Sequence, residues 1–130
     1  NLFRAYDNLT APDSILVVAS NSGTAMFTIA SSGHVISKND GIPTIACTAG
    51  SPTIETGSTD VAGEFTAGAA ATACTLTFKK PWTTAPACMG AADSATGIAL
   101  GIQTTTTTAV FNSATMGAVS FNYICIGFNN

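Results

Sequence analysis

The side chains that most often carry enzyme chemistry are sparse in this sequence. It has a single histidine, His34, and the nearby Ser31 and Ser32 are too close to it in sequence to complete a catalytic triad. The GxSxG motif that presents a nucleophilic serine is absent. The seven carboxylates are scattered rather than paired: Asp7, Asp13, Asp40, Glu55, Asp60, Glu64 and Asp93. We therefore expect that the chain is not an enzyme.

The cysteines could bind metal or form disulfides. The four of them show no CxxC or CxxH spacing, so we expect no zinc site. The sequence also has no EF-hand loop and no glycine-rich phosphate loop, and we expect no cofactor. Two disulfides or buried thiols remain, and two disulfides would imply an oxidising compartment. The four candidates are Cys47, Cys74, Cys88 and Cys125.

Three pairings of four cysteines are possible. Each cysteine lies in or beside a segment with the pattern of a β-strand. Cys88 and Cys125 lie in the two motifs closest to the expected core, so we favour this pair, which leaves Cys47 with Cys74. Peptide mapping without reduction would decide between this pairing and the other two.

Charge and hydropathy limit the partners. Only 8% of the residues are charged, against about 25% in an ordinary soluble domain. The net charge is −3, and four basic residues cannot neutralise a track of phosphates, so we expect no nucleic acid partner. No apolar run reaches the roughly 18 residues of a membrane span, so we expect no membrane insertion. Surfaces with so little charge are common where sister chains bury them.

The elements that would position these residues are short strands. Glycine and proline recur every eight to twelve residues, which predicts antiparallel strands and an all-β fold. We expect an N-terminal β-meander or stalk segment over residues 1–42, with strands at LFRAYDN, SILVVAS, TAMFTIA and HVISK. This segment is too small and apolar to be stable alone. Its most apolar strand supplies four candidates for pairing between subunits: Ile15, Leu16, Val17 and Val18.

Residues 43–130 have the pattern of an antiparallel, jelly-roll-like β-sandwich. In TACTLTFKK, Cys74, Leu76 and Phe78 share one face, and threonines occupy the other. The last strand, AVSFNYICIGFN, is apolar on both faces, so we expect it to be central in its sheet or covered by two layers. Trp82, between Pro81 and two threonines, is the aromatic side chain most suited to contact a sugar, although core packing is its favoured role.

Four short motifs carry a resemblance. They are a Gly-x-x-Asp-x-Ala-Gly turn at residues 57–63, Cys-Thr-x-x-Phe at 74–78, Trp-x-x-x-Pro-x-Cys at 82–88 and Tyr-Ile-Cys-Ile-Gly at 123–127. In this combination, over about residues 47–128, the chain resembles a domain that recurs in phage tail-fibre and bacterial surface-fibre proteins. The resemblance implies an extracellular homotrimeric fibre with a β-sandwich knob at its C-terminal end. It implies no enzymatic activity, and it transfers no receptor-binding residue.

Three functions follow from these observations as hypotheses. The first is a structural and adhesive module of an extracellular homo-oligomeric fibre, which binds copies of itself and a cell-surface glycan or receptor. The second is a self-polymerising, pilus-like filament subunit, in which an N-terminal strand completes the sheet of the next chain. The third is a small carbohydrate-binding module. A fixed trimer in dilute solution would exclude the filament, and a glycan array with Trp82→Ala as control would test the module.

Overall fold

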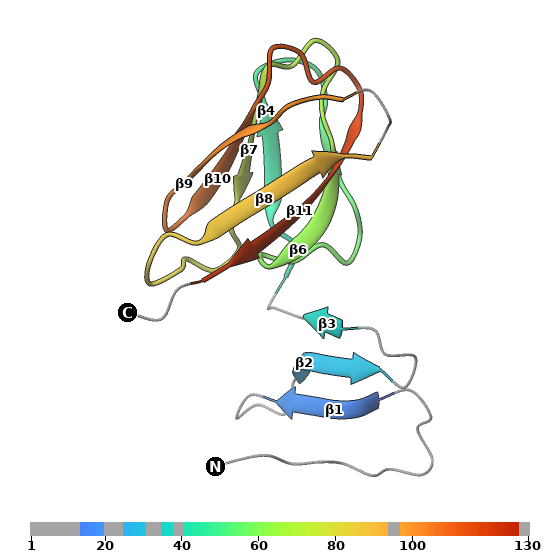
Figure 1. Ribbon diagram of the computed structural model, residues 1–130, viewed down its shortest axis with the longest axis vertical. Helices are drawn as coiled ribbons and strands as arrows, with labels where there is room; N and C mark the ends of the chain where they lie inside the picture. Colours follow the sequence, from blue (N-terminus) through green and yellow to red (C-terminus); the bar gives the residue numbers. More distant parts are fainter. Residues whose placement is uncertain (1–13, 20–24, 31–34, 38–40, 94–96, 128–130) are drawn as a thin grey trace. The chain divides into compact units, whose positions relative to one another are not determined.

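A computed structural model describes residues 14–19, 25–30, 35–37, 41–93 and 97–127 (Figure 1). Within these ranges the chain forms eleven strands and no helix, which confirms the predicted all-β class. The chain divides into two compact units, Asn1–Asn39 and Asp40–Asn130. This division falls between residues 39 and 40, whereas the sequence placed it between 42 and 43.

The N-terminal unit contains a three-stranded antiparallel meander. Its strands are β1 (Ser14–Ala19), β2 (Ala25–Ala30) and β3 (Val35–Ser37), in the order β1-β2-β3. Strand β1 pairs with β2, with Val17 opposite Thr28 and Val18 opposite Phe27. The candidate intersubunit strand therefore has a partner within its own chain. The strand expected at LFRAYDN and the single histidine lie outside the described residues.

The C-terminal unit contains two antiparallel sheets of four strands each, which confirms the predicted β-sandwich (Figure 1). The first sheet has the order β4-β7-β10-β9, with strands β4 (Thr44–Cys47), β7 (Ala73–Thr77), β10 (Thr108–Asn112) and β9 (Gly101–Thr104). The second has the order β5-β6-β11-β8, with strands β5 (Thr53–Ile54), β6 (Ala62–Thr66), β11 (Ser120–Ile126) and β8 (Ala87–Ala92). Among the described strands of this unit, only β5 and β6, and β9 and β10, are adjacent both in sequence and in a sheet. The other connections pass from one sheet to the other, so residues distant in sequence become neighbours.

The core lies between the two sheets and follows the period of two that strands impose. From the first sheet, Leu76 and Phe111 are fully buried, and from the second, Phe65 and Phe121. The ring of Phe65 stacks on Phe121 at 5.5 Å between centroids and tilts against Phe111 at 5.1 Å. The contact between Phe65 and Phe111 crosses from one sheet to the other, while Phe65 and Phe121 are register partners within the second sheet.

Threonine covers much of the outer face of the first sheet. Thr77 on β7 lies opposite Thr44 on β4 and Thr108 on β10, so three hydroxyl-bearing side chains form a row across three strands. Five consecutive threonines, residues 104–108, form the turn between β9 and β10 together with the adjoining residue of each strand. The turn is held by the Thr105 hydroxyl, which accepts hydrogen bonds from the backbone N–H groups of Thr107 and Thr108 at 3.2 and 3.0 Å.

Candidate functional site

The four cysteines form two disulfides, each within one sheet. Cys47–Cys74 joins β4 to β7, and Cys88–Cys125 joins β8 to β11. In both cases the partners lie directly opposite each other in the strand register, with Cα atoms 4.0 and 4.1 Å apart. The predicted disulfides are confirmed with the favoured pairing. They indicate folding in an oxidising environment.

Trp82 packs against the protein's own surface. Its half-buried ring meets Phe78 edge-on at 6.0 Å between centroids. It also lies so close to Gly127 that a Cβ atom there would be 2.7 Å from the ring. The indole Nε1 is buried and has no hydrogen-bond partner. These contacts show the packing of Trp82, while its contact with a sugar stays a prediction.

Asp60 is the one buried carboxylate among the described residues, with 5% of its surface exposed. Its Oδ1 accepts a hydrogen bond from the backbone N–H of Lys79 at 2.7 Å, and its Oδ2 accepts one from Lys80 at 2.8 Å. The carboxylate thus ties the loop before β6 to the chain that follows β7. Both of its oxygens are occupied by backbone donors, which is a structural role.

The two residues before Asp60 also bind backbone groups through their side chains. The hydroxyl of Ser58 donates to the backbone oxygen of Glu64 at 3.2 Å and accepts from its backbone N–H at 3.1 Å. The hydroxyl of Thr59 accepts hydrogen bonds from two backbone N–H groups of the following turn. On β11, the hydroxyl of Tyr123 donates to the backbone oxygen of Thr59 at 2.6 Å. We call Ser58, Thr59, Asp60 and Tyr123 the polar bracket.

The polar bracket explains part of the motif at residues 57–63. Gly63 has no space for a side chain, because a Cβ atom there would lie 2.5 Å from the Ser58 side chain and 2.7 Å from the Tyr123 hydroxyl. The aspartate of the motif binds backbone, as described above. The polar bracket was not predicted from the sequence, where its only signal is the spacing of the glycines and the aspartate within the motif.

The described residues offer no evident metal site. No group of three or more histidine, cysteine, aspartate or glutamate side chains in the described ranges is arranged to hold an ion. None of the described residues belongs to a helix that could span a lipid bilayer.

The outer face of the second sheet exposes large apolar side chains. Met89 on β8 is 62% exposed, and Ile124 and Ile126 on β11 are 40% and 55% exposed. Met89 lies directly opposite Ile124 in the strand register, and Ile126 lies one step further along the same face. We call these three residues the apolar strip.

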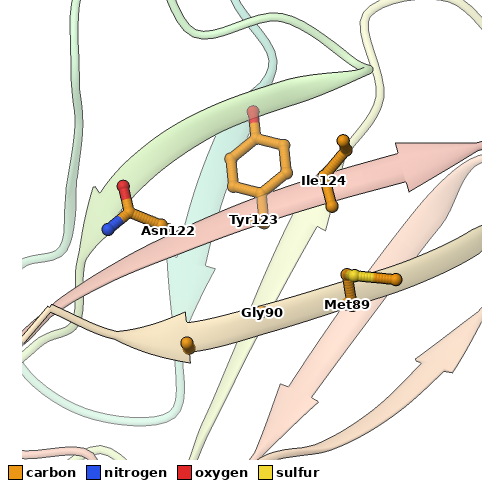
Figure 2. Close-up of a pocket in the computed structure, with 6 residues that line it drawn as sticks. Met89, Gly90, Asn122, Tyr123 and Ile124 are labelled. Atoms are coloured by element: carbon orange, nitrogen blue, oxygen red, sulfur yellow. The ribbon is translucent and has the colours of Figure 1, made fainter.

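A shallow hollow of about 320 Å³ adjoins the apolar strip. It lies over the backbone of Gly90 and Tyr123 (Figure 2). The register partners Met89 and Ile124 bound it on one side, and the register partners Ala91 and Asn122 bound it on the other. Its full lining is Met89, Gly90, Ala91, Asn122, Tyr123 and Ile124. Most of this lining is apolar, and the Asn122 amide is the polar side chain at its rim.

The last strand was expected to be central in its sheet or covered by two layers, and the first alternative is confirmed. Strand β11 is an inner strand, between β6 and β8, so it is central in its sheet as expected. Its Phe121, Tyr123 and Cys125 face the core and are buried. Ile124 and Ile126 face outward, and no second layer formed by the described residues of the C-terminal unit covers them. The sequence pattern could not tell whether such a cover comes from the same unit.

Comparison with known proteins adds no relative. No protein-family model matches the chain, and neither a curated protein nor a solved structure matches it.

Proposed function

We propose that this chain is a structural and adhesive module of an extracellular homo-oligomeric fibre, of the kind found in phage tails and on bacterial surfaces. The observation that carries the proposal is the apolar strip on the outer face of a disulfide-linked sandwich. Apolar side chains exposed on a sheet face are typical of protein–protein contacts. The expected assembly is a homotrimer.

The construction of the sandwich supports a role outside the cell. Each sheet has its own disulfide, which ties one edge strand covalently to its inner neighbour: β4 to β7 in the first sheet and β8 to β11 in the second. Crosslinks of this kind persist in oxidising surroundings and are rare in the reducing cytosol. A stable scaffold is what a fibre exposed to solvent and proteases needs.

The use of the buried polar groups supports a structural rather than a catalytic role. Asp60, Ser58 and Thr59 are all buried, and their side-chain oxygens bind backbone groups. A catalytic carboxylate needs at least one oxygen directed at the substrate. The polar bracket instead uses its carboxylate to fix loops.

Self-association also fits the composition. Only 8% of the residues are charged, and a free surface with so little charge tends to associate. In a fibre, sister chains would cover part of that surface. The adhesive part of the proposal, contact with a cell-surface glycan or receptor, would use the remaining exposed loops and faces.

The mass of the full chain in solution, with its disulfides intact, tests this proposal. We expect a fixed trimer in native mass spectrometry and in light scattering across a wide range of concentrations. A ladder of species that lengthens with concentration would indicate an open filament instead. A monomer at every concentration would contradict the proposed fibre.

A second measurement tests adhesion. The assembled protein is applied to a glycan array, beside Trp82→Ala as a matched variant. Binding that the variant loses would place the glycan at Trp82. Binding that the variant retains would place it elsewhere on the module.

A further inference from the structure

We infer that the hollow over the backbone of Gly90 and Tyr123 is a binding site for one neutral sugar ring of a cell-surface glycan. This inference rests on the proposed function, because it assigns a place and a chemical class to the adhesive contact. Figure 2 shows the hollow with Met89 and Ile124 on one side and Asn122 on the other.

The size of the hollow suits a small ligand. Its volume is about 320 Å³, and ligand pockets in proteins begin at about 300 Å³. A stable contact with another protein would bury about 800 Å² on each partner, which is far more than one shallow hollow and its rim offer. The hollow therefore fits a single ring better than it fits the surface of a protein.

One wall of the hollow is apolar. It consists of the register partners Met89 and Ile124, which are 62% and 40% exposed. A pyranose ring presents C–H groups on its faces, and packing these groups against apolar side chains removes both surfaces from water. Methionine suits such a wall, because its unbranched and flexible side chain adapts to the shape of the ring.

The opposite wall carries groups that form hydrogen bonds. The amide Nδ2 of Asn122 lies 3.4 Å from Oδ1 of Asp93. Glu64 on β6 is the register partner of Asn122, and it faces outward because the next residue, Phe65, faces the core. Carboxylate and amide oxygens accept hydrogen bonds from hydroxyl groups. This wall therefore offers several acceptors to the hydroxyls of a sugar.

The charge beside the hollow disfavours acidic sugars. Glu64 and Asp93 place two carboxylates on this side of the sheet, whereas the lysines among the described residues, Lys79 and Lys80, follow the end of β7 in the other sheet. A sialic acid or a sulfated sugar would meet like charge with no nearby cation to offset it. A neutral hexose meets no such repulsion.

The spacing of the two carboxylates favours a sugar over a small cation. Glu64 lies on β6 and Asp93 directly follows β8, and the inner strand β11 separates these two strands. Neighbouring strands lie about 4.8 Å apart, so the carboxylates are attached to strands about 9.6 Å apart. Acceptors on separate strands match a ligand with several separate donors, such as a ring of hydroxyl groups, better than one ammonium group.

The shallowness of the hollow fits a site that works in a fibre. A small ligand in one open hollow binds weakly, with a dissociation constant in about the millimolar range. Three linked copies that engage clustered glycans together gain about 10²–10⁴-fold in overall affinity. The hollow lies on the side of Met89 and Ile124 away from Ile126, so a sister chain seated at Ile126 would leave it open.

The first experiment uses a glycan array and the full, assembled chain with its disulfides intact. The array carries neutral glycans that end in glucose, galactose, mannose, fucose or N-acetylhexosamines, beside sialylated and sulfated glycans. We expect binding to neutral glycans and none to the acidic ones. Binding to acidic glycans alone, or to no glycan, would overturn the inference. The fibre itself would still stand if the chain forms the expected trimer.

Two matched variants then locate the sugar. Ala91→Phe fills the hollow with a larger side chain, and Ala87→Phe makes the same change at an exposed position of β8 outside the hollow. Binding to the preferred neutral glycan should weaken at least tenfold in the first variant and less than twofold in the second. Thermal unfolding shows that both variants have folded. Retained binding in Ala91→Phe would overturn the inference, and loss in Trp82→Ala would then place the sugar at Trp82.

A titration of the wild-type chain gives a readout that depends on no variant. Methyl glycosides of glucose, galactose and mannose are added while nuclear magnetic resonance records the backbone amide signals. Signals of Gly90, Ala91 and Asn122 should shift with at least one of these glycosides. Ethylammonium chloride serves as the cationic probe. Shifts confined to other residues would overturn the inference, and so would shifts of these three signals at lower concentrations of ethylammonium than of any glycoside.

Discussion

The hydroxyl of Tyr123 donates a hydrogen bond of 2.6 Å to the backbone oxygen of Thr59, which lies 64 positions earlier in the chain. This bond joins inner strand β11 to the turn that precedes β6. Burial raises the pKa of Tyr123 well above its usual value, and the negative charge of Asp60 raises it further. Both effects favour the neutral phenol, which is the form that can donate this hydrogen bond.

Tyr123→Phe should destabilise the C-terminal unit by about 1–2 kcal/mol at neutral pH. The ring remains to fill the core, but the backbone oxygen of Thr59 loses its donor inside the protein. Urea unfolding with the disulfides intact measures the difference. An unchanged free energy of unfolding would show that water replaces the hydroxyl without cost.

The pH dependence of that difference is a separate prediction. A folded-state pKa above the unfolded-state value of about 10 means that the contribution of Tyr123 is fully present below pH 10. Above pH 10 the unfolded chain loses the phenol proton first, so stability falls by at most about 1.4 kcal/mol per pH unit. Because lysines titrate in the same range, the relevant measurement is wild type minus Tyr123→Phe from pH 8 to 12. The difference should be constant to about pH 10 and then shrink.

Asp60→Asn should destabilise the unit by about 2–4 kcal/mol, because an amide retains only one acceptor oxygen for two backbone donors. One of the N–H groups of Lys79 and Lys80 then faces the new NH₂ group. Asp93→Asn is the matched control: Asp93 is exposed, and its contact with the Asn122 amide is a long 3.4 Å. The control should change stability by less than about 0.5 kcal/mol. Equal effects from both variants would mean that net charge, rather than the polar bracket, is responsible.

Gly63→Ala should destabilise the unit by about 1–3 kcal/mol or prevent it from folding, because the added methyl group would overlap the Ser58 side chain and the Tyr123 hydroxyl. Gly101→Ala on β9 is the control. There the nearest atom, the backbone oxygen of Asn112, is 3.9 Å from an added Cβ, so a neutral or slightly stabilising effect is expected. Thermal unfolding of the two variants under the same conditions provides the comparison. A tolerated Gly63→Ala would mean that the bracket can shift to accept a side chain.

The sequence predicted the strands of the C-terminal unit well because one alternating pattern determines both strand and buried face. Cys74, Leu76 and Phe78 were expected on one face, and all three are buried. Strand neighbours were harder to predict, since β11 pairs with β6 and β8, which lie about 60 and 30 residues earlier. Such pairings depend on contacts between distant segments, and local pattern does not encode them.

The candidate sites also differ in whether local sequence predicts them. The disulfide pairing followed from strand-like positions and closeness to the core, both of which local sequence indicates. The polar bracket did not, because Ser58, Thr59 and Asp60 are residue types that normally lie in solvent. The apolar strip was visible as Ile124 and Ile126 on the second face of a strand. The exposure of the apolar strip could not be predicted. An apolar strand face indicates that it is buried against something, but the local sequence does not show whether the same chain or another molecule buries it.

The two disulfides should contribute nearly equally to stability, because they close loops of similar length. The paired cysteines are separated by 27 residues in Cys47–Cys74 and by 37 in Cys88–Cys125. The chain-entropy relation gives about 3–4 kcal/mol for each loop, and the longer loop exceeds the shorter by only about 0.3 kcal/mol. Replacing each pair by two alanines and measuring guanidinium unfolding tests this. A much larger loss for the Cys88–Cys125 pair would mean that this bond, on the strand that carries the apolar strip, stabilises the folded state through packing as well as through loop closure.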